Sequence, residues 1–440
     1  MKILKRSLLL LLTIVILLVV FNYPKLNIIA GYSAKSMNSS VFLAGRTLQF
    51  TDSTDNNFSP INLASDVVNI DKKSATSSVF GLLTRTAIYR EGLGSVLITD
   101  DYDTSLKVRV PKRTNPDNTT AFPFGNANQK DSVFASVSYS KLNKTVENLF
   151  TNNTQTRAVI VIHKNQIIAE QYAKGFTKDS RILGWSMTKS IMSTVFGIMQ
   201  TQGKINVFDK APIKEWQNDD RKEITINNLL QMNSGLEWDE NYNEISDVTK
   251  MLFLEKDMTT VQIEKPFVGK PNETWNYSSG TSNLLSGIFR NTFKTHQEYL
   301  DYWYTNLIDK IGMNSMVIET DMSGNYVGSS YAWATPRDWA KFGLLYLNKG
   351  NWNGEQLFDA SWVDYITTPT IGSDGTYGGH FWLNVESQFT DVPKNMFYAS
   401  GYQGQFVFVF PDQDLVVVRM GLSHIDINGF LKGVLESIEK

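Results

Sequence analysis

Ser186 and Lys189 stand three positions apart in the stretch 184-GWSMTKSIMSTVFGIMQ-200. A serine hydroxyl beside a partly buried amine can act as a nucleophile with its general base, because burial drives the ammonium toward its neutral form. The alternative makes Ser186 a helix N-cap and Lys189 a surface residue, and the pattern alone favours that alternative. The same spacing recurs at 138–141 and 437–440, so the motif needs support from its surroundings.

The residues after Ser186 predict a buried helix. Apolar side chains recur at helical spacing along it, and Gly203 follows as a C′ glycine would. The positions of this stripe are Ile191, Val195, Ile198 and Met199. Lys189 would then lie on the same helix face as Ser186, one turn further on. The unpaired N–H groups and positive dipole end of the helix would stabilise an oxyanion formed on Ser186.

Strand patterns at both ends of this region predict the element that carries the helix. The stretch 158–173 reads as a hairpin joined at 164–165, and strands return near the C-terminus, with a final helix at 429–440. The C-terminal strands are expected at 380–385, 405–410 and 414–421, and the residues 205–360 between the two ends look mainly helical. The predicted fold is α+β, an α/β sandwich. Its antiparallel sheet is covered by helices, beside a mainly helical lobe, with a ligand cleft between the lobes.

The N-terminus predicts export. Lys2, Lys5 and Arg6 precede the apolar run 8–21, as in a signal peptide that is either cleaved or kept as a membrane anchor. We therefore expect three parts: a signal peptide or N-terminal membrane anchor (1–32), an extension and linker (33–132) and a catalytic domain (133–440). The expected location is periplasmic or extracellular. The segment 80–96 of the extension could pack on the domain or form a small cap.

Composition narrows the chemistry. The chain has a net charge of −2 without a basic stripe, which argues against a nucleic-acid partner. It has no cysteine, so thiolate catalysis, disulfides and cysteine-ligated metals are excluded. Its four histidines (His163, His296, His380 and His424) lack metal-ligand spacing, and a structural role is expected for each. The serine chemistry itself requires neither a metal nor an organic cofactor.

Further motifs follow Ser186 in an order that resembles the penicillin-recognising serine enzymes, a β-lactamase/transpeptidase-like family. The resemblance runs from about residue 140 to the C-terminus. It is closest to the class C β-lactamase-related branch, which includes DD-peptidases, esterases and 6-aminohexanoate-dimer hydrolases. The segments that carry it are 184-GWSMTKS-190, 224-ITINNLLQMNSGLEW-238, 277-YSSG-280, 335-TPRDWAKFGLLYLNKGNWNGEQL-357 and 401-GYQGQFVFVFPDQDLVVV-418.

This resemblance implies roles for individual residues. Ser186 would be the acylated nucleophile, Lys189 its general base, and Tyr277 the relay that carries the proton to the leaving group. Ser279 would hydrogen-bond alongside, and the backbone N–H groups of Ser186 and Gln405 would form the oxyanion hole. A second Y-x-S, at 398–400, is out of family order and is expected to be structural.

The third motif departs from the family pattern. Tyr402, Gln403 and Gly404 stand where K-T-G or H-x-G is usual, so the cation or imidazole that helps hold a β-lactam carboxylate is missing. Gly404 keeps the close backbone approach that the strand needs. The favoured function is cleavage of a small-molecule or peptide-like amide or ester, and the first alternative is a β-lactamase or DD-peptidase. A non-catalytic module that binds cell-wall peptides is the alternative of another class. Aromatic residues at 238–275 and 377–382 could line an apolar cleft or belong to the core.

Overall fold

The computed structural model describes residues 2–129, 133–151, 154–423 and 425–438. Its main sheet has six strands in the order β12-β13-β14-β15-β5-β6, and every neighbouring pair is antiparallel. Strands from both ends of the catalytic region therefore share one sheet, as predicted. The strand bounds are β5 Thr156–His163, β6 Gln166–Tyr172, β12 Trp382–Leu383, β13 Phe397–Gly401, β14 Gln405–Phe410 and β15 Leu415–Gly421.

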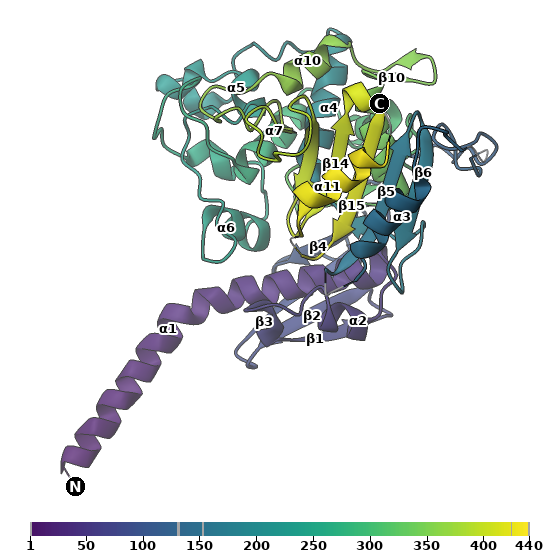
Figure 1. Cartoon of the computed structure of the whole chain (residues 1–440). Coiled ribbons are helices and arrows are strands. Elements are labelled where there is room, and N and C mark those ends of the chain that lie inside the picture. The colour runs from purple at the N-terminus through teal and green to yellow at the C-terminus, as the bar shows by residue number, and fades with distance from the viewer. Residues whose placement is uncertain (1, 130–132, 152–153, 424, 439–440) are drawn as a thin grey trace.

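Helices cover both faces of this sheet (Figure 1). The central strands alternate apolar side chains between two cores, as a pleated strand must when both of its faces are buried. On β15, Val416 and Val418 face α9 (Pro336–Leu347), whereas Val417 faces α3 (Tyr139–Asn148) and α11 (Ile427–Glu436). The α/β sandwich predicted from the sequence is confirmed.

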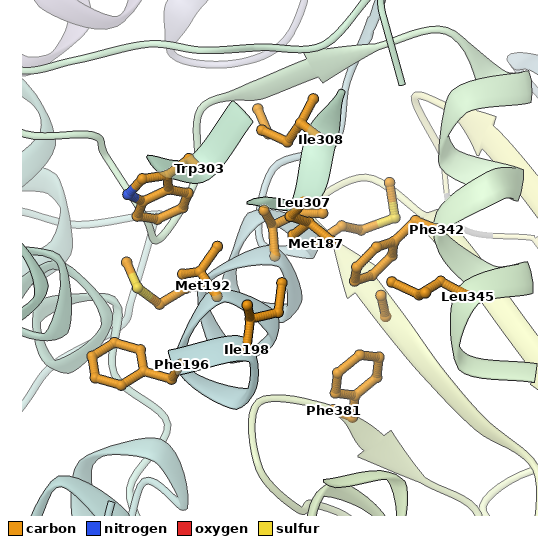
Figure 2. Close-up of a cluster of buried hydrophobic side chains, with 14 of the residues drawn as sticks. Met187, Met192, Phe196, Ile198, Trp303, Leu307, Ile308, Phe342, Leu345 and Phe381 are labelled. Atoms are coloured by element: carbon orange, nitrogen blue, oxygen red, sulfur yellow. The ribbon is translucent and has the colours of Figure 1, made fainter. Parts of the chain in front are cut away.

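The predicted helix after Ser186 is α4 (Met187–Thr201), and it lies in the middle of the main core. Every residue from Met187 to Met199 is buried. The apolar stripe read from the sequence predicted burial of only one face of this helix. Figure 2 shows Met187, Met192 and Phe196 among side chains from neighbouring elements. The helix ends at Thr201, and Gly203 follows with a φ of +65°, in the left-handed region expected of a C′ glycine.

The helical lobe and its connections fill the chain between α4 and β12. Its helices are α5 Ile226–Leu230, α6 Asp247–Leu254, α7 Ser279–Asn291, α8 His296–Trp303 and α10 Ser361–Thr367. Short strands complete it: β7 Ile182–Leu183, β8 Val317–Ile318, β9 Ala332–Ala334, β10 Asn351–Trp352 and β11 Glu355–Gln356. The strands β7, β9 and β8 form a small sheet that leads the chain into the segment holding Ser186.

The N-terminal extension is a folded unit. Helix α1 (Lys2–Asn38) runs through the predicted boundary at residue 32 and packs against a four-stranded antiparallel sheet (Figure 1). The strands are β1 Ala64–Asn69, β2 Ser74–Val79, β3 Leu83–Arg90 and β4 Gly94–Ile98, and α2 (Leu48–Ser53) precedes them. The segment 80–96 supplies most of β3 and β4, and the sheet packs on the catalytic domain through a core shared with α6 and Trp185.

The first turns of α1 project away from the rest of the molecule (Figure 1). Large apolar side chains there are exposed, for example Leu8, Leu12 and Val20. Across the described residues, however, none of the helices combines the length and the apolar character that crossing a membrane requires. The predicted transmembrane helix is therefore not supported. The apolar run is the start of a helix whose later turns are buried inside the protein.

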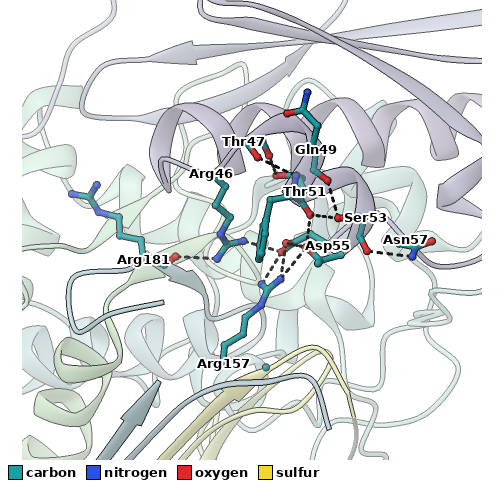
Figure 3. A network of polar contacts seen from close by, with 12 residues as sticks. Arg46, Thr47, Gln49, Thr51, Ser53, Asp55, Asn57, Arg157 and Arg181 are labelled. Atoms are coloured by element: carbon teal, nitrogen blue, oxygen red, sulfur yellow. Dashed lines mark hydrogen bonds and ion pairs between the residues drawn. The ribbon is translucent and has the colours of Figure 1, made fainter. Parts of the chain in front are cut away.

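A polar network also joins the extension to the main sheet. Asp55 receives two hydrogen bonds from the Arg157 guanidinium on β5, at 2.8 Å and 2.6 Å, and a third from Arg46 at 2.8 Å (Figure 3). Arg181 donates to the Leu43 backbone oxygen from the catalytic side at 3.2 Å. The two guanidinium groups hold the pKa of the Asp55 carboxyl well below its usual range despite burial. The extension is thus bound by ion pairs as well as by apolar contact.

Candidate active site

The backbone before Ser186 is held in a strained conformation. Trp185 has a φ of +49°, a left-handed conformation that is a genuine outlier for a bulky side chain. Its ring packs between Tyr32 of α1 and Tyr402, with centroids 6.1 Å and 5.6 Å away. Ser186 follows at the start of α4, half-buried, and its side chain makes no capping hydrogen bond. Ser186 therefore occupies the N-cap position without capping the helix, and its hydroxyl is directed to other partners.

Lys189 lies one turn along α4 and is 1% exposed, so it is not a surface residue. Its Nζ is 3.2 Å from the Ser186 Oγ, 2.9 Å from the Ser279 Oγ and 3.0 Å from the Ser329 backbone oxygen. Burial lowers the pKa of Lys189 from 10.5 to about 8, and the negative charge of Glu240 opposes this shift. A substantial neutral fraction of this amine is therefore present in mildly alkaline water, within reach of the serine proton.

Tyr277 stands on the other side of the pair. The Lys189 Nζ lies 4.9 Å from the centre of its ring, and its hydroxyl has Ser186 as a hydrogen-bond partner. Burial and the Glu240 charge raise the pKa of Tyr277 well above 10, although the Ser186 hydrogen bond opposes them. Tyr277 thus stays a phenol at neutral pH. Of these two side chains, Lys189 is therefore the one that can accept a proton near neutral pH, as the uncharged amine.

Glu240 is a site residue that the sequence analysis missed. Its carboxylate accepts hydrogen bonds from the Ser279 Oγ at 2.5 Å and the Ser279 backbone N–H at 2.9 Å. The Trp238 Nε1 donates to it at 2.5 Å, and the Tyr242 hydroxyl donates at 3.3 Å. Ser279 therefore accepts from Lys189 and donates to Glu240, which forms a chain from the amine to a carboxylate. The only signal was the segment 238-WDENY-242 directly after a recognised motif.

The third-motif residues form the turn between β13 and β14. Gly401, at the end of β13, approaches the nucleophile segment so closely that a Cβ there would lie 2.1 Å from the Gly184 backbone oxygen. Gly404 has a φ of +82°, which a glycine adopts without strain. This turn brings Tyr402 against Trp185, directly beside Ser186.

Comparison with known proteins fits this geometry. The sequence profile of a family described as Beta-lactamase matches residues 142–421, more than half of the chain. The chain belongs to the beta-lactamase family. This is a family of serine hydrolases, which makes the protein a serine hydrolase and confirms the family expected from the motifs.

This beta-lactamase-family protein is similar to a curated relative and to several solved structures. A 6-aminohexanoate-dimer hydrolase of Paenarthrobacter ureafaciens is 21% identical over 299 residues, which are 61% of this chain and 72% of that protein. A solved structure of a putative 6-aminohexanoate-dimer hydrolase from Bacillus anthracis has a TM-score of 0.56 at 21% identity, covering 74% of this chain and 88% of its own. A family VIII carboxylesterase structure has a TM-score of 0.55 at 13% identity, covering 70% and 99%. The solved structures confirm the predicted fold.

The structure brings most of the predicted site residues of this family member together. Ser186, Lys189 and Ser279 are in contact, and Tyr277 lies on Lys189 and Ser186. The Gln405 side chain is turned away, because its Nε2 donates to the Tyr402 and Gly421 backbone oxygens and its Oε1 accepts from the Gly421 N–H.

The buried Arg419 holds the third-motif turn by hydrogen bonds to its backbone oxygens. Arg419 is 0% exposed, and its Nη1 lies 2.8 Å from the Gly404 backbone oxygen and 3.4 Å from that of Gln403. Its Nη2 donates at 3.0 Å to the Thr154 backbone oxygen and at 3.0 Å to the Thr156 hydroxyl. The guanidinium is committed to the turn and its neighbours, so it does not stand in for the missing third-motif cation.

The aromatic residues divide between the site and the core. Trp382 and Tyr377 lie 5.4 Å and 5.8 Å from the Tyr277 ring, whereas Phe381 packs on Tyr346 in the main core. Trp238 and Tyr242 surround Glu240 instead. Tyr398 of the second Y-x-S is buried in β13.

The histidines near this site and elsewhere contact backbone oxygens. His380 is buried between the Leu230 oxygen at 2.6 Å and the Ser282 hydroxyl at 3.0 Å, and burial lowers its pKa to about 3. His163 and His296 contact the oxygens of Gln413 and Gly324, and His424 lies outside the described residues. Within the described part of the chain, no three His, Asp or Glu side chains are placed to hold a metal ion.

Proposed function

We propose that this hydrolase cleaves an amide or ester bond of a small-molecule or peptide-like substrate through an acyl-enzyme on Ser186. The observation that carries the proposal is the buried Lys189, whose amine is 3.2 Å from the Ser186 hydroxyl and has a pKa lowered to about 8. An activated serine needs a base within hydrogen-bond reach that titrates near the working pH. Lys189 meets both requirements.

The chemistry proceeds in two halves. Neutral Lys189 accepts the Ser186 proton as the Oγ attacks the substrate carbonyl, and the proton then passes by way of Tyr277 to the leaving amine or alkoxide. A water molecule subsequently attacks the ester carbon, loses its proton to the same basic groups and releases the acid together with Ser186. The backbone N–H groups of Ser186 and Gln405 hold the oxyanion in both halves. Loss of one such donor typically costs about 10²–10³ in rate.

Glu240 enters this scheme through Ser279. The carboxylate fixes the Ser279 hydroxyl so that its oxygen accepts from Lys189. Its negative charge also raises the pKa of Lys189, against the effect of burial. Glu240 is therefore a positioning residue that sets the protonation of the base without touching Ser186.

Two observations favour an amide or ester over a β-lactam. The third-motif turn carries Tyr402 and Gln403 in place of a lysine or histidine, and the nearby Arg419 is committed beneath that turn. A β-lactam or DD-peptidase substrate would lack the cation that its carboxylate needs. The relatives described as 6-aminohexanoate-dimer hydrolase and carboxylesterase support the same preference.

The test is covalent labelling of the purified protein at its reactive serine. A fluorophosphonate probe should label the wild type at Ser186, and Ser186→Ala should abolish both labelling and hydrolysis of p-nitrophenyl esters and linear amides. Labelling that survives Ser186→Ala would overturn the assignment. Nitrocefin hydrolysis faster than every ester and amide would favour a β-lactamase instead, and labelling without turnover of any substrate would favour the non-catalytic binding module.

We also propose that the protein works outside the cytoplasm, with its N-terminal segment as the export signal or anchor. The proposal is supported by Lys5 and Arg6 ahead of an apolar run on α1, in which Leu8, Leu12 and Val20 are exposed. Fractionation of producing cells should place the hydrolase in the envelope or the medium. Recovery of the intact chain only from the cytoplasm would contradict this location.

A further inference from the structure

An apolar pocket lies where the N-terminal extension meets the catalytic domain. It has a volume of about 390 Å³, within the range typical of small-molecule sites. The extension supplies one wall from α1, from the segment 58–63 and from Phe80. The catalytic domain supplies the other wall from the segment 242–249, Phe253 and Tyr402.

The lining is largely hydrocarbon and aromatic. Its apolar members are Leu26, Ile28, Ile29, Tyr32, Phe58, Pro60, Ile61, Leu63, Phe80, Tyr242, Ile245, Phe253 and Tyr402. Two of them form an accessible rim, since Leu63 is 45% exposed and Phe80 is 68% exposed. Such a surface binds apolar groups by removing them from water. The charged side chains in the lining are Lys25 and Glu244.

Two tyrosines connect this pocket to the catalytic residues. Tyr242 lines the pocket and donates its hydroxyl to Glu240, which hydrogen-bonds Ser279 beside Lys189. Tyr402 stacks on Tyr242 with centroids 5.4 Å apart and packs against Trp185, the residue before the nucleophile. The pocket therefore begins one layer of side chains away from Ser186.

The helix that builds one wall also carries exposed apolar residues. Leu8, Leu12, Leu17 and Val20 are more than half exposed on the turns of α1 that precede the pocket residue Leu26. A molecule with a hydrocarbon chain finds exposed apolar side chains along this helix before the pocket, whose lining on α1 also includes Asn22 and Lys25.

We propose that this pocket receives the hydrocarbon chain of the substrate, so that the enzyme prefers esters or amides with a long acyl or alkyl chain. The inference rests on the proposed function, because the chain enters the pocket while its carbonyl is presented to Ser186. The N-terminal extension is then part of the substrate site and determines chain-length specificity. This role assigns a function to the part of the chain that precedes the family domain.

The first experiment compares p-nitrophenyl esters from acetate to dodecanoate. In the wild type, KM should fall by up to roughly fourfold for each methylene that becomes buried. Leu63→Trp fills the rim, so it should flatten this dependence on chain length. Leu82→Trp is the matched control, because Leu82 is 55% exposed on the same extension and does not line the pocket. An unchanged chain-length dependence in Leu63→Trp would overturn the proposal.

The second experiment separates the pocket from the chemistry. Ser186→Ala cannot turn over substrate, yet it should bind dodecanoate more tightly than hexanoate by calorimetry, and adding Leu63→Trp should weaken dodecanoate binding at least tenfold. This result would support the pocket even if no ester were hydrolysed. Equal affinity for both acids would refute the pocket and leave the acyl-enzyme proposal standing. A change of oligomeric state in Leu63→Trp, with no effect on either acid, would assign the pocket to a second copy of the chain.

Discussion

At the scale of single residues, the pKa of Lys189 should govern the pH dependence of turnover. The amine must be neutral to accept the Ser186 proton, so kcat/KM should rise about tenfold per pH unit below its pKa of about 8 and level off above it. Glu240→Gln removes the negative charge that raises this pKa. The midpoint should therefore move to lower pH in that variant.

Glu237→Gln provides the control for this shift. Glu237 is exposed on the same loop and does not contact the Ser279 hydroxyl, so its loss should leave the midpoint in place. Steady-state rates from pH 5.5 to 10 measure both variants. A midpoint that stays the same in Glu240→Gln would exclude Glu240 as the residue that sets the protonation of Lys189.

Tyr277→Phe should separate ring packing from proton transfer. The variant keeps the ring beside Lys189 and loses only the hydroxyl that faces Ser186. We expect kcat to fall by about 10²–10⁴, typical of a lost general acid–base group, with little change in the melting temperature. Tyr398→Phe, in the other Y-x-S, should have no such effect because its hydroxyl donates to Gln388. Equal rates in wild type and Tyr277→Phe would remove Tyr277 from the mechanism.

The sequence predicted the residues whose geometry is local. Ser186 and Lys189 are one helical turn apart, so once α4 forms, their proximity follows from helix geometry. Glu240 was missed because it reaches Ser279 from 39 positions earlier through a loop with no periodic pattern. The positive φ of Trp185 likewise depends on Tyr32 and Tyr402, which come from distant parts of the chain.

At the scale of elements, the close approach of β13 to the nucleophile segment holds the site together. Gly401→Ala would place a methyl group 2.1 Å from the Gly184 backbone oxygen, and neither backbone can move without displacing Ser186 or the third-motif turn. We expect a loss of roughly 1–3 kcal/mol in stability from this overpacking, with kcat/KM falling more than tenfold.

Gly175→Ala is a suitable comparison for that variant. Gly175 has a φ of +88° and open space around its Cα, so the substitution costs only backbone strain, about 1 kcal/mol. Its activity should match the wild type when both are assayed well below their melting temperatures. Full activity in Gly401→Ala would show that the strand and the nucleophile segment can separate without consequence.

The elements themselves were predictable to different degrees. The hairpin β5–β6 and the pair β14–β15 were recognisable because their apolar runs are bounded by turn residues, and the C-terminal helix has a clear amphipathic pattern. Strand β13 is short, and it became a strand through its pairing with β14. The sequence predicts a leader at α1 because basic residues there precede the apolar run 8–21. The second half of this helix carries Ala30, Ala34 and Met37 at helical spacing, which is the pattern of its buried face.

At the scale of the whole molecule, one buried ion pair links the extension to the catalytic domain. Glu319 is 0% exposed and lies in the catalytic domain just after β8. The Lys35 Nζ of α1 donates to it at 2.5 Å, and the Ser39 hydroxyl, the Ser95 N–H and the Trp333 Nε1 donate as well. Among these partners, only Lys35 brings a compensating charge. The buried negative charge of Glu319, in the catalytic domain, is therefore compensated by a lysine of the extension.

This dependence predicts a strong non-additive effect on stability. Lys35→Met leaves Glu319 buried without its counter-charge and should cost roughly 3–5 kcal/mol, as removal of one partner of a buried pair typically does. Glu319→Gln in the same chain should recover much of that loss, because no charge is then left unpaired. Lys73→Met breaks an exposed pair with Glu91 and should change stability by about 1 kcal/mol or less. Thermal denaturation of the wild type, the two single variants, the double variant and Lys73→Met measures the coupling. Simple additivity of Lys35→Met and Glu319→Gln would mean that the two side chains do not stabilise each other.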